Sequence, residues 1–240
     1  MDIRINPDPQ INVIELSQSQ RCVVIDNFLV EPDKLVAHAQ DHASDFVFPE
    51  RAYPGGVLPL SSGFLQPMQA FIKRTMVSYF PVRRGGMSFS SQLCLTTLQP
   101  RDFTWIQRLC HTDPGMKSGK SNYAAILYLF NNPALGGTAF FNWKDEGYWR
   151  EMTARQQQDP HAGLEELESK FQLFRDPPCY MSDSNEAAEK LGAVSARFNR
   201  CIFYSGGIPH GACVDQPELL TSNPRSGRLT LNVFIAATAQ

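Results

Sequence analysis

The chain has 240 residues, of which 42% are hydrophobic and 11% aromatic, enough to bury a substantial core. This composition excludes a fibrous or disordered chain and predicts one folded domain over 1–240. The 22 basic and 24 acidic side chains leave a formal net charge of −2 without a long run of either sign, so we expect no nucleic-acid partner. No apolar run approaches about 18 residues and no export signal is evident, which predicts a cytoplasmic protein with no membrane attachment.

Six cysteines are scattered through the chain without a C-x-x-C pair. Most of them lie inside apolar runs, as Cys94 does in Ser91-Gln92-Leu93-Cys94-Leu95. This distribution is typical of reduced, buried thiols in a cytoplasmic protein, and it argues against a disulfide framework or a zinc knuckle.

Residues 1–86 are expected to form a strand and helices that support a β domain. The β-branched run at 22–29 closes on an Asp-Asn turn, which predicts a strand. Pro32 begins an apolar stripe that predicts a helix over 32–44, and apolar residues at helical spacing predict another over 64–79.

From residue 87 the chain changes to short extended runs separated by Gly, Pro and Asn. In the last of them, apolar residues alternate with Arg228, Thr230 and Asn232, which share the opposite face of the expected strand. Short strands at this spacing imply a β sandwich or barrel, so the fold class is mainly β with flanking helices (α+β). The expected strands are 88–98, 122–130, 137–143, 198–204, 208–214 and 228–236.

A polar stretch at 144–192 separates the two β blocks, 87–143 and 193–240, and is too long for an ordinary loop. Helical patterning recurs within it and includes the segment 186–189. We expect a helical insertion on the β core rather than a separate domain. It would act either as a lid over a functional site or as a buttress on the outside of the barrel.

The sharpest local feature is His111-Thr112-Asp113, directly after an apolar stretch. Side chains at i and i+2 of an extended segment point the same way, so this imidazole and carboxylate can converge on one ion. A second histidine, His210, lies among glycines between two expected strands. Two imidazoles and one carboxylate suit Fe(II), whereas zinc more often takes three histidines or thiolates, and Mg or Ca recruits more oxygens.

The order of these segments resembles the Fe(II)/2-oxoglutarate-dependent dioxygenases, and within them the prolyl-hydroxylase-like branch. The resemblance covers about residues 22–235. It implies a double-stranded β-helix, a jelly-roll or cupin-like barrel, with a metal at its open mouth. The pieces that carry it are the opening run 22–29, His111-Thr112-Asp113, Tyr128-Leu129-Phe130-Asn131-Asn132, Gly136-Gly137-Thr138-Ala139-Phe140-Phe141, His210 and Gly227-Arg228.

The resemblance implies that His111, Asp113 and His210 are the iron ligands at the catalytic centre. Relatives that halogenate replace this carboxylate with a small residue to make room for chloride. The presence of Asp113 therefore favours hydroxylation.

The same resemblance implies a set of residues for the co-substrate, 2-oxoglutarate. Arg228 would bind its distal carboxylate, because a guanidinium offers a planar fork of two donors. Tyr128 stands where the family often places a phenol donor to that carboxylate; the alternative is a core tyrosine satisfied elsewhere. Asn232 shares the face of Arg228, and Gln99 could offer an amide where relatives often carry a tyrosine.

The spacing between His210 and Arg228 departs from the family pattern, since it is about twice the usual length. The segment 215–224 must therefore bulge out as a loop if Arg228 is the functional residue. Arg225 is the alternative cation for the same carboxylate.

Together these features predict a non-haem Fe(II)- and 2-oxoglutarate-dependent oxygenase that hydroxylates an unactivated C–H bond of a small-molecule or amino-acid-derived substrate, with release of succinate and CO2. The alternative is a cupin-like protein that binds or senses a metal or small molecule without catalysis, because barrels of this type host unrelated functions. Substrate identity and oligomeric state stay open at this point.

Overall fold

The structure is a computed structural model that describes residues 3–49, 53–82, 86–113, 120–159 and 163–238. Two antiparallel sheets form its centre, which confirms a mainly β chain with flanking helices. The large sheet holds, in spatial order, β1 (Gln10–Glu15), β2 (Arg21–Asp26), β8 (Cys201–Ser205), β5 (Lys120–Tyr128), β10 (Arg228–Thr238), β4 (Ser88–Thr96) and β3 (Gly55–Pro59); the small sheet holds β7 (Ala188–Val194), β6 (Gly137–Trp143) and β9 (His210–Cys213).

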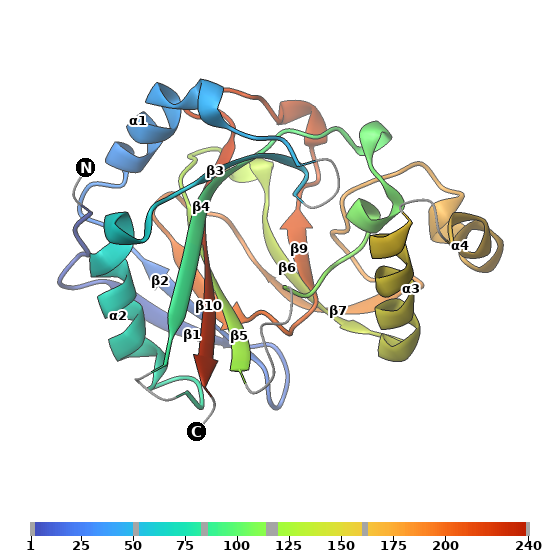
Figure 1. Cartoon of the computed structure of the whole chain (residues 1–240), viewed down its shortest axis with the longest axis horizontal. Helices are drawn as coiled ribbons and strands as arrows, with labels where there is room; N and C mark the ends of the chain where they lie inside the picture. Colours follow the sequence, from blue (N-terminus) through green and yellow to red (C-terminus); the bar gives the residue numbers. More distant parts are fainter. Residues whose placement is uncertain (1–2, 50–52, 83–85, 114–119, 160–162, 239–240) are drawn as a thin grey trace.

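Helices lie at both ends of this arrangement. In Figure 1, α1 (Asp33–Asp41) and α2 (Gln66–Met76) lie on the side of the large sheet away from the small sheet. The helices α3 (Glu146–Gln158) and α4 (Leu164–Lys170) lie beyond the small sheet. The helices expected over 32–44 and 64–79 are thus present in slightly shorter form.

The period-2 pattern of β10 decides which side chains enter the space between the sheets. Leu229 and Leu231 are fully buried in the core cluster that also contains apolar residues of α1 and α2. Because alternate residues of a strand point to opposite faces, Arg228, Thr230 and Asn232 point toward the small sheet. The alternation predicted from the sequence is confirmed.

A second core fills the space between the two sheets. Tyr128 of β5 and Tyr204 of β8 meet Phe140 of β6 there, and all three side chains are almost completely buried. The rings of Phe140 and Tyr204 pack edge to face, with centroids 5.0 Å apart. This layer holds the two sheets at a fixed separation and forms the floor of the site described below.

Three strands differ from the expectations drawn from sequence. Residues 186–189 were expected to be helical, but β7 begins at Ala188 and pairs with β6, so that prediction is wrong. The pairing with β6 outweighs the local helical propensity of an Ala- and Glu-rich segment. β1 and β3 were not predicted; they lie at the two edges of the large sheet. β1 is exposed along its length, whereas β3 is a five-residue run that begins with two glycines and ends with a proline, residues that are typical of turns.

The helical part of 144–192 has a small core of its own. Trp149 and Met152 of α3 pack with Leu167 of α4 and with Trp105, which precedes the β5 strand. Trp143, at the end of β6, stacks on Trp149 with ring centroids 5.5 Å apart. The two helices are therefore anchored to the end of the small sheet by aromatic packing.

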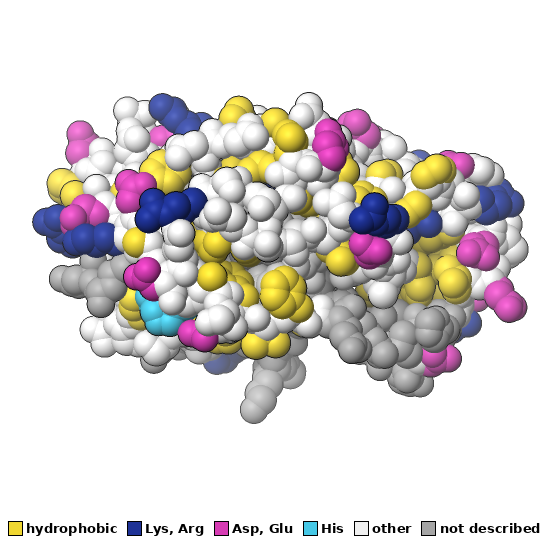
Figure 2. All heavy atoms as spheres, turned by 90° about the horizontal axis from the view of Figure 1, so that it is seen from above, with side chains coloured by type: hydrophobic (Ala, Val, Ile, Leu, Met, Phe, Trp, Pro, Cys, Tyr) yellow, Lys and Arg dark blue, Asp and Glu magenta, His cyan; other side chains and the backbone are white. Residues whose placement is uncertain are grey.

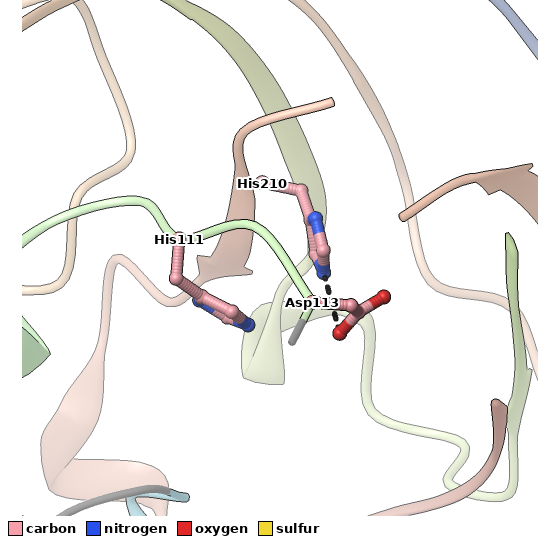
Figure 3. A group of neighbouring side chains, drawn as sticks. All are labelled: His111, Asp113 and His210. Atoms are coloured by element: carbon pink, nitrogen blue, oxygen red, sulfur yellow. Dashed lines mark ion pairs between the residues drawn. The ribbon is translucent and has the colours of Figure 1, made fainter. Parts of the chain in front are cut away.

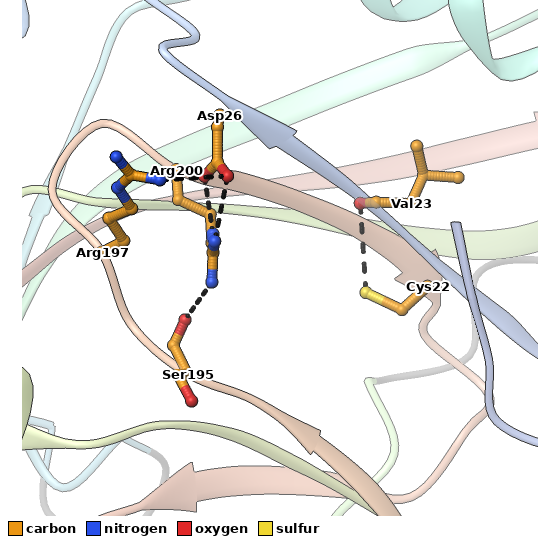
Figure 4. A network of polar contacts seen from close by, with 6 residues as sticks. All are labelled: Cys22, Val23, Asp26, Ser195, Arg197 and Arg200. Atoms are coloured by element: carbon orange, nitrogen blue, oxygen red, sulfur yellow. Dashed lines mark hydrogen bonds and ion pairs between the residues drawn. The ribbon is translucent and has the colours of Figure 1, made fainter. Parts of the chain in front are cut away.

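A buried ion pair joins β2 to the turn before β8. Asp26 accepts two hydrogen bonds from Arg200, from Nε at 2.7 Å and from Nη2 at 3.0 Å, and Arg197 approaches to 3.5 Å (Figure 4). Arg200 also donates from Nη1 to the Ser195 carbonyl oxygen. These contacts lower the pKa of Asp26, chiefly through the hydrogen bonds from Arg200. Fork-shaped pairing of this kind is among the stronger polar contacts in proteins.

Replacing Asp26 by Asn should lower the free energy of unfolding by about 2 kcal/mol, because it leaves the partly buried Arg200 without its anion. The contribution of a carboxyl group with a lowered folded pKa is present above its unfolded pKa, near 3.9, and is lost as the pH falls below that value. Urea unfolding should therefore show that the difference in the free energy of unfolding between parent and variant shrinks as the pH falls below about 4 and through the lowered pKa of Asp26. Asp183→Asn, at an exposed pair with Lys190, is the control and should cost less than about 1 kcal/mol; equal losses would contradict this account.

The surface carries charges of both signs. On the face drawn in Figure 2, basic and acidic side chains are interspersed, and the residues shown in colour form no patch of one sign. No helix in the described ranges is long and apolar enough to cross a membrane.

Candidate metal centre

The two histidines predicted as ligands meet through their backbones. His210 is the first residue of β9, and His111 forms an isolated antiparallel bridge with it. Each amide donates to the other residue's carbonyl oxygen, at 2.9 and 2.8 Å. His111 thereby extends the small sheet by one residue beyond β9. A reciprocal capping box of Thr104 and Gln107 orders the 3-10 helix that leads into this position.

The structure brings the three predicted ligands to one point. Figure 3 shows the rings of His111 and His210 and the carboxylate of Asp113 converging. One ligand atom from each lies within 4.8 Å of the others, and His210 Nε2 is 3.8 Å from Asp113 Oδ1. His111 is exposed at the edge of the site, whereas His210 is buried. A single ion is within reach of all three after small side-chain rotations.

Asp113 is positioned by the turn between β8 and β9. Its amide donates to the carbonyl oxygen of Gly206 at 2.8 Å. A Cβ atom at Gly206 would lie 2.7 Å from Asp113 Oδ2 and 3.0 Å from Asp113 Cβ. Only a residue without a side chain allows the carboxylate to come this close to the turn.

Gly206→Ala should therefore displace the Asp113 carboxylate without breaking the strands around it. We expect Fe(II) affinity to fall about 10- to 100-fold, the range seen when a group that orients a metal ligand is changed. Gly207→Ala is the matched control, because its Cβ would meet only Ser205 Oγ at 3.6 Å. The Fe(II) affinity of both variants can be measured by metal titration with thermal unfolding as the readout. Equal affinities in the two variants would contradict this role of Gly206.

The tautomer of His210 is set by its surroundings. Its Nδ1 lies 2.8 Å from the carbonyl oxygen of Ile208, so the proton sits on Nδ1 and the lone pair of Nε2 faces Asp113 and His111. Burial lowers the pKa of His210 to about 4. His111 is more exposed than His210, but the surrounding site desolvates its ring, and this desolvation, together with the nearby His210, also lowers its pKa. Both rings are thus neutral at physiological pH, the form that binds metals.

Asp113 carries the clearest sign that a cation belongs here. Its Oδ2 atom is buried and has no hydrogen-bond partner among the described residues. Burial raises the pKa of Asp113, and His111 opposes that rise. A buried carboxylate oxygen without a partner costs about 1–3 kcal/mol, and a metal ion removes that cost. The donor set of two imidazoles and one carboxylate fits Fe(II) with open positions better than a closed zinc site.

Arg228 lies between the sheets and is 4% exposed. Its guanidinium uses three of its five N–H donors on protein atoms, which leaves one donor on each terminal nitrogen. No carboxylate pairs with it in the described part of the chain. Its partners are the carbonyl oxygens of Leu135 (3.0 Å) and Gly136 (3.3 Å) at Nε, Thr96 Oγ1 (3.2 Å) at Nη1 and the Gly137 carbonyl oxygen (2.7 Å) at Nη2.

The alternative cation for the distal carboxylate, Arg225, lies outside the two sheets. Arg225 is exposed in the loop before β10, and its Nε donates to Gln40 of α1. After β9 ends at Cys213, residues 214–227 leave the sheets as a loop with one short 3-10 turn, which includes the segment 215–224 that was expected to bulge out. Of the two cations, only Arg228 is buried between the two sheets.

The other residues predicted to bind the co-substrate make hydrogen bonds within the protein. The Tyr128 hydroxyl lies 2.8 Å from Thr138 Oγ1, and both groups are buried. Asn232 accepts from Thr230 on the same face of β10 as Arg228. Gln99 donates its amide to the Pro217 carbonyl oxygen at 2.9 Å, so this donor stabilises the loop before β10.

Three tyrosines that the sequence reasoning did not select also lie near this interior. Tyr204 packs edge-on against the His210 ring at 4.7 Å. Tyr53 hydrogen-bonds Thr96 Oγ1 at 2.6 Å, and Arg228 helps to counter the burial that raises its pKa to about 12. Tyr180 donates to the Leu98 carbonyl oxygen. These three tyrosines belong to no sequence motif. Their positions in strands and loops of the folded chain bring them near this interior.

A cavity of about 440 Å³ opens beside the metal ligands. His111 forms part of its wall, next to Gly207 and Pro209 of the β8–β9 turn. The opposite elements are the end of β6 and the helix α3. The insertion therefore forms a wall of the space into which His111 opens, in addition to packing on its own core.

One family model matches residues 7–235, nearly the whole chain, and describes a family of unknown function (DUF6445). The chain belongs to this DUF6445 family. No curated protein matches it.

Solved structures similar to this DUF6445 member include proteins of the class that its motifs resemble. HygX from Streptomyces hygroscopicus, with nickel and 2-oxoglutarate bound, is 13% identical at a TM-score of 0.45, over 90% of this chain and 82% of its own. A Pseudomonas putida prolyl-4-hydroxylase is 12% identical at 0.44 (92% and 90%), and EvdO2 from Micromonospora carbonacea var. aurantiaca is 10% identical at 0.46 (97% and 94%). At such identities and TM-scores the reaction has to be inferred from this chain's own residues.

Proposed function

We propose that this DUF6445 protein is an Fe(II)- and 2-oxoglutarate-dependent oxygenase that hydroxylates a C–H bond of a small molecule. The observation that carries the proposal is the convergence of His111, Asp113 and His210 around a buried carboxylate oxygen that lacks a partner. We also infer that the two facing sheets form the double-stranded β-helix of such enzymes, because both line one shared interior core.

The three ligands define the metal site by their chemistry. Two neutral imidazoles and one carboxylate occupy one side of an ion and leave the other side open for ligands. The Ile208 carbonyl oxygen holds the proton of His210 on Nδ1, which keeps Nε2 free to bind. When bound, Fe(II) with 2-oxoglutarate and dioxygen would supply the oxidation that converts R–H to R–OH, with release of succinate and CO2.

Arg228 is the residue that we assign to the distal carboxylate of 2-oxoglutarate. The carbonyl oxygens of Leu135 and Gly137 fix its guanidinium, so a ligand meets a preorganised cation. One free donor on each terminal nitrogen can serve a carboxylate fork. Thr230 and Asn232 follow on the same face of β10 and continue this polar strip.

The surroundings of the ligands keep water away from the reacting centre. Tyr204 and Phe140 pack against one another directly behind His210. On the open side, α3 forms the far wall of the cavity that borders His111. A substrate in that cavity would close the remaining solvent path.

One observation favours the alternative, a non-catalytic binding protein with the same barrel. Arg228 already donates to three carbonyl oxygens and one hydroxyl, a set that can serve the fold alone. Such a protein would bind a metal but would not consume 2-oxoglutarate.

Succinate formation distinguishes the proposed oxygenase from the non-catalytic binding protein. The purified protein with Fe(II), 2-oxoglutarate and dioxygen should release succinate and CO2, slowly without substrate, and chelation of the metal should stop the release. Metal binding at one ion per chain without any 2-oxoglutarate binding or consumption would overturn the oxygenase proposal in favour of the alternative.

A further inference from the structure

The cavity beside His111 has a charged wall that metal binding does not require. Glu146 and Arg150 both line it, and they lie one turn apart on α3. Both side chains are exposed to the cavity or solvent. Neither makes an ion pair or hydrogen bond with another residue in the described ranges.

The spacing of the two residues would allow them to pair with each other. A glutamate four residues before an arginine on a helix is the favourable orientation for an ion pair, with Cβ atoms about 5–6 Å apart. On the same helix, Arg155 does pair with Glu166 of α4 at 2.9 Å. Glu146 and Arg150 instead present one negative and one positive group, side by side, to the same space.

The rest of the wall suits a compact molecule with polar ends. Trp143 and Ile106 supply apolar surface, and Asn142 supplies an amide. Gln20, from the turn between β1 and β2, also lines the cavity, and its Oε1 is buried without a hydrogen-bond partner. An unpartnered acceptor and a carboxylate in the wall of one cavity favour a ligand that brings N–H donors.

We propose that the substrate is an amino-acid-like zwitterion, with its free carboxylate on Arg150 and its free ammonium on Glu146, so that its side chain extends toward His111. The inference rests on the proposed oxygenase function for the reaction, but the binding it predicts does not depend on turnover. A volume of about 440 Å³ is in the range of small-molecule sites and is too small for a folded partner.

The test uses free amino acids together with their N-acetyl derivatives, which lack the ammonium, and their primary amides, which lack the carboxylate. Calorimetry without oxygen, on protein loaded with Fe(II) and 2-oxoglutarate, should detect at least one free amino acid and neither of its blocked forms. Arg150→Gln and Glu146→Gln should each weaken that binding about 10- to 100-fold, as expected for loss of a charge-assisted hydrogen bond. The controls, Glu151→Gln and Arg175→Gln, are exposed and lie outside the cavity wall, so they should bind as the parent does.

The outcomes separate this inference from the proposed function. Binding of a free amino acid that the two α3 variants weaken, without succinate formation, would support the zwitterion site and overturn the oxygenase. Succinate formation by a protein that binds no free amino acid, or binds blocked and free forms equally, would overturn the zwitterion site and leave the oxygenase standing. Unchanged binding of the free amino acid in both α3 variants would also overturn the zwitterion site.

Discussion

His210→Ala is expected to abolish stoichiometric Fe(II) binding while the two sheets stay folded. The side chain supplies one of three ligands, and its removal leaves an ion held by His111 and Asp113 alone. The backbone bridge to His111 does not need the imidazole, so β9 should keep its place. Fe(II) titration with a chelator competitor should show a loss of affinity of about 100-fold or more, the upper end of the effect of weakening a metal site indirectly.

His42→Ala is the matched control. The ring of His42, the C-cap of α1, lies tilted against that of His38 with centroids 4.1 Å apart, but no carboxylate joins them in a ligand group within the described chain. This variant should bind iron as the parent does. If His210→Ala kept full affinity with an intact near-ultraviolet circular dichroism spectrum, the triad would be wrong.

Arg228→Ala is expected to lower 2-oxoglutarate affinity by about 2–5 kcal/mol, as when one partner of a buried charge pair is truncated. Iron affinity should change little, because the guanidinium does not contact the ligand side chains. The variant also loses the bonds to Leu135 and Gly137, so its thermal stability must be measured beside the affinity. Arg228→Lys keeps the positive charge but lacks the two-donor fork of the guanidinium. Its 2-oxoglutarate affinity should lie between those of the parent and the alanine variant.

Arg225→Ala should leave 2-oxoglutarate binding unchanged, because that side chain lies outside the sheets on Gln40. Calorimetric titration of all three variants checks the series. A greater loss in Arg225→Ala than in Arg228→Ala would reverse the assignment. A fall in stability alone, with unchanged 2-oxoglutarate affinity in Arg228→Lys, would assign Arg228 to the fold.

The convergence of the three candidate ligands His111, Asp113 and His210 was predicted from a local spacing and from the family resemblance. His111 and Asp113 are two residues apart in an extended segment, which fixes their common direction. The structure places His210 at the start of β9, and the backbone bridge to His111 explains why the two imidazoles meet. The alternation in β10 likewise fixed the face of Arg228, because Leu229 and Leu231 pack into the core that contains apolar residues of α1 and α2, and Arg228 lies on the opposite face.

Other features depend on contacts that no local pattern encodes. β7 carries an Ala- and Glu-rich start and becomes a strand only by pairing with β6. Gln99 was a candidate for the co-substrate, but the loop carbonyl of Pro217 accepts its amide. The charged wall formed by Glu146 and Arg150 follows from the place of α3 beside His111, which depends on aromatic packing between distant segments.

An anaerobic titration of Fe(II) into the protein with 2-oxoglutarate tests the central claim most directly. A chelate of 2-oxoglutarate on iron held by His111, Asp113 and His210 should produce a weak visible charge-transfer band that saturates at one iron per chain. The band should be absent from His210→Ala and require more 2-oxoglutarate in Arg228→Lys. A parent protein that binds one Fe(II) per chain yet gives no band and no 2-oxoglutarate binding would contradict the account.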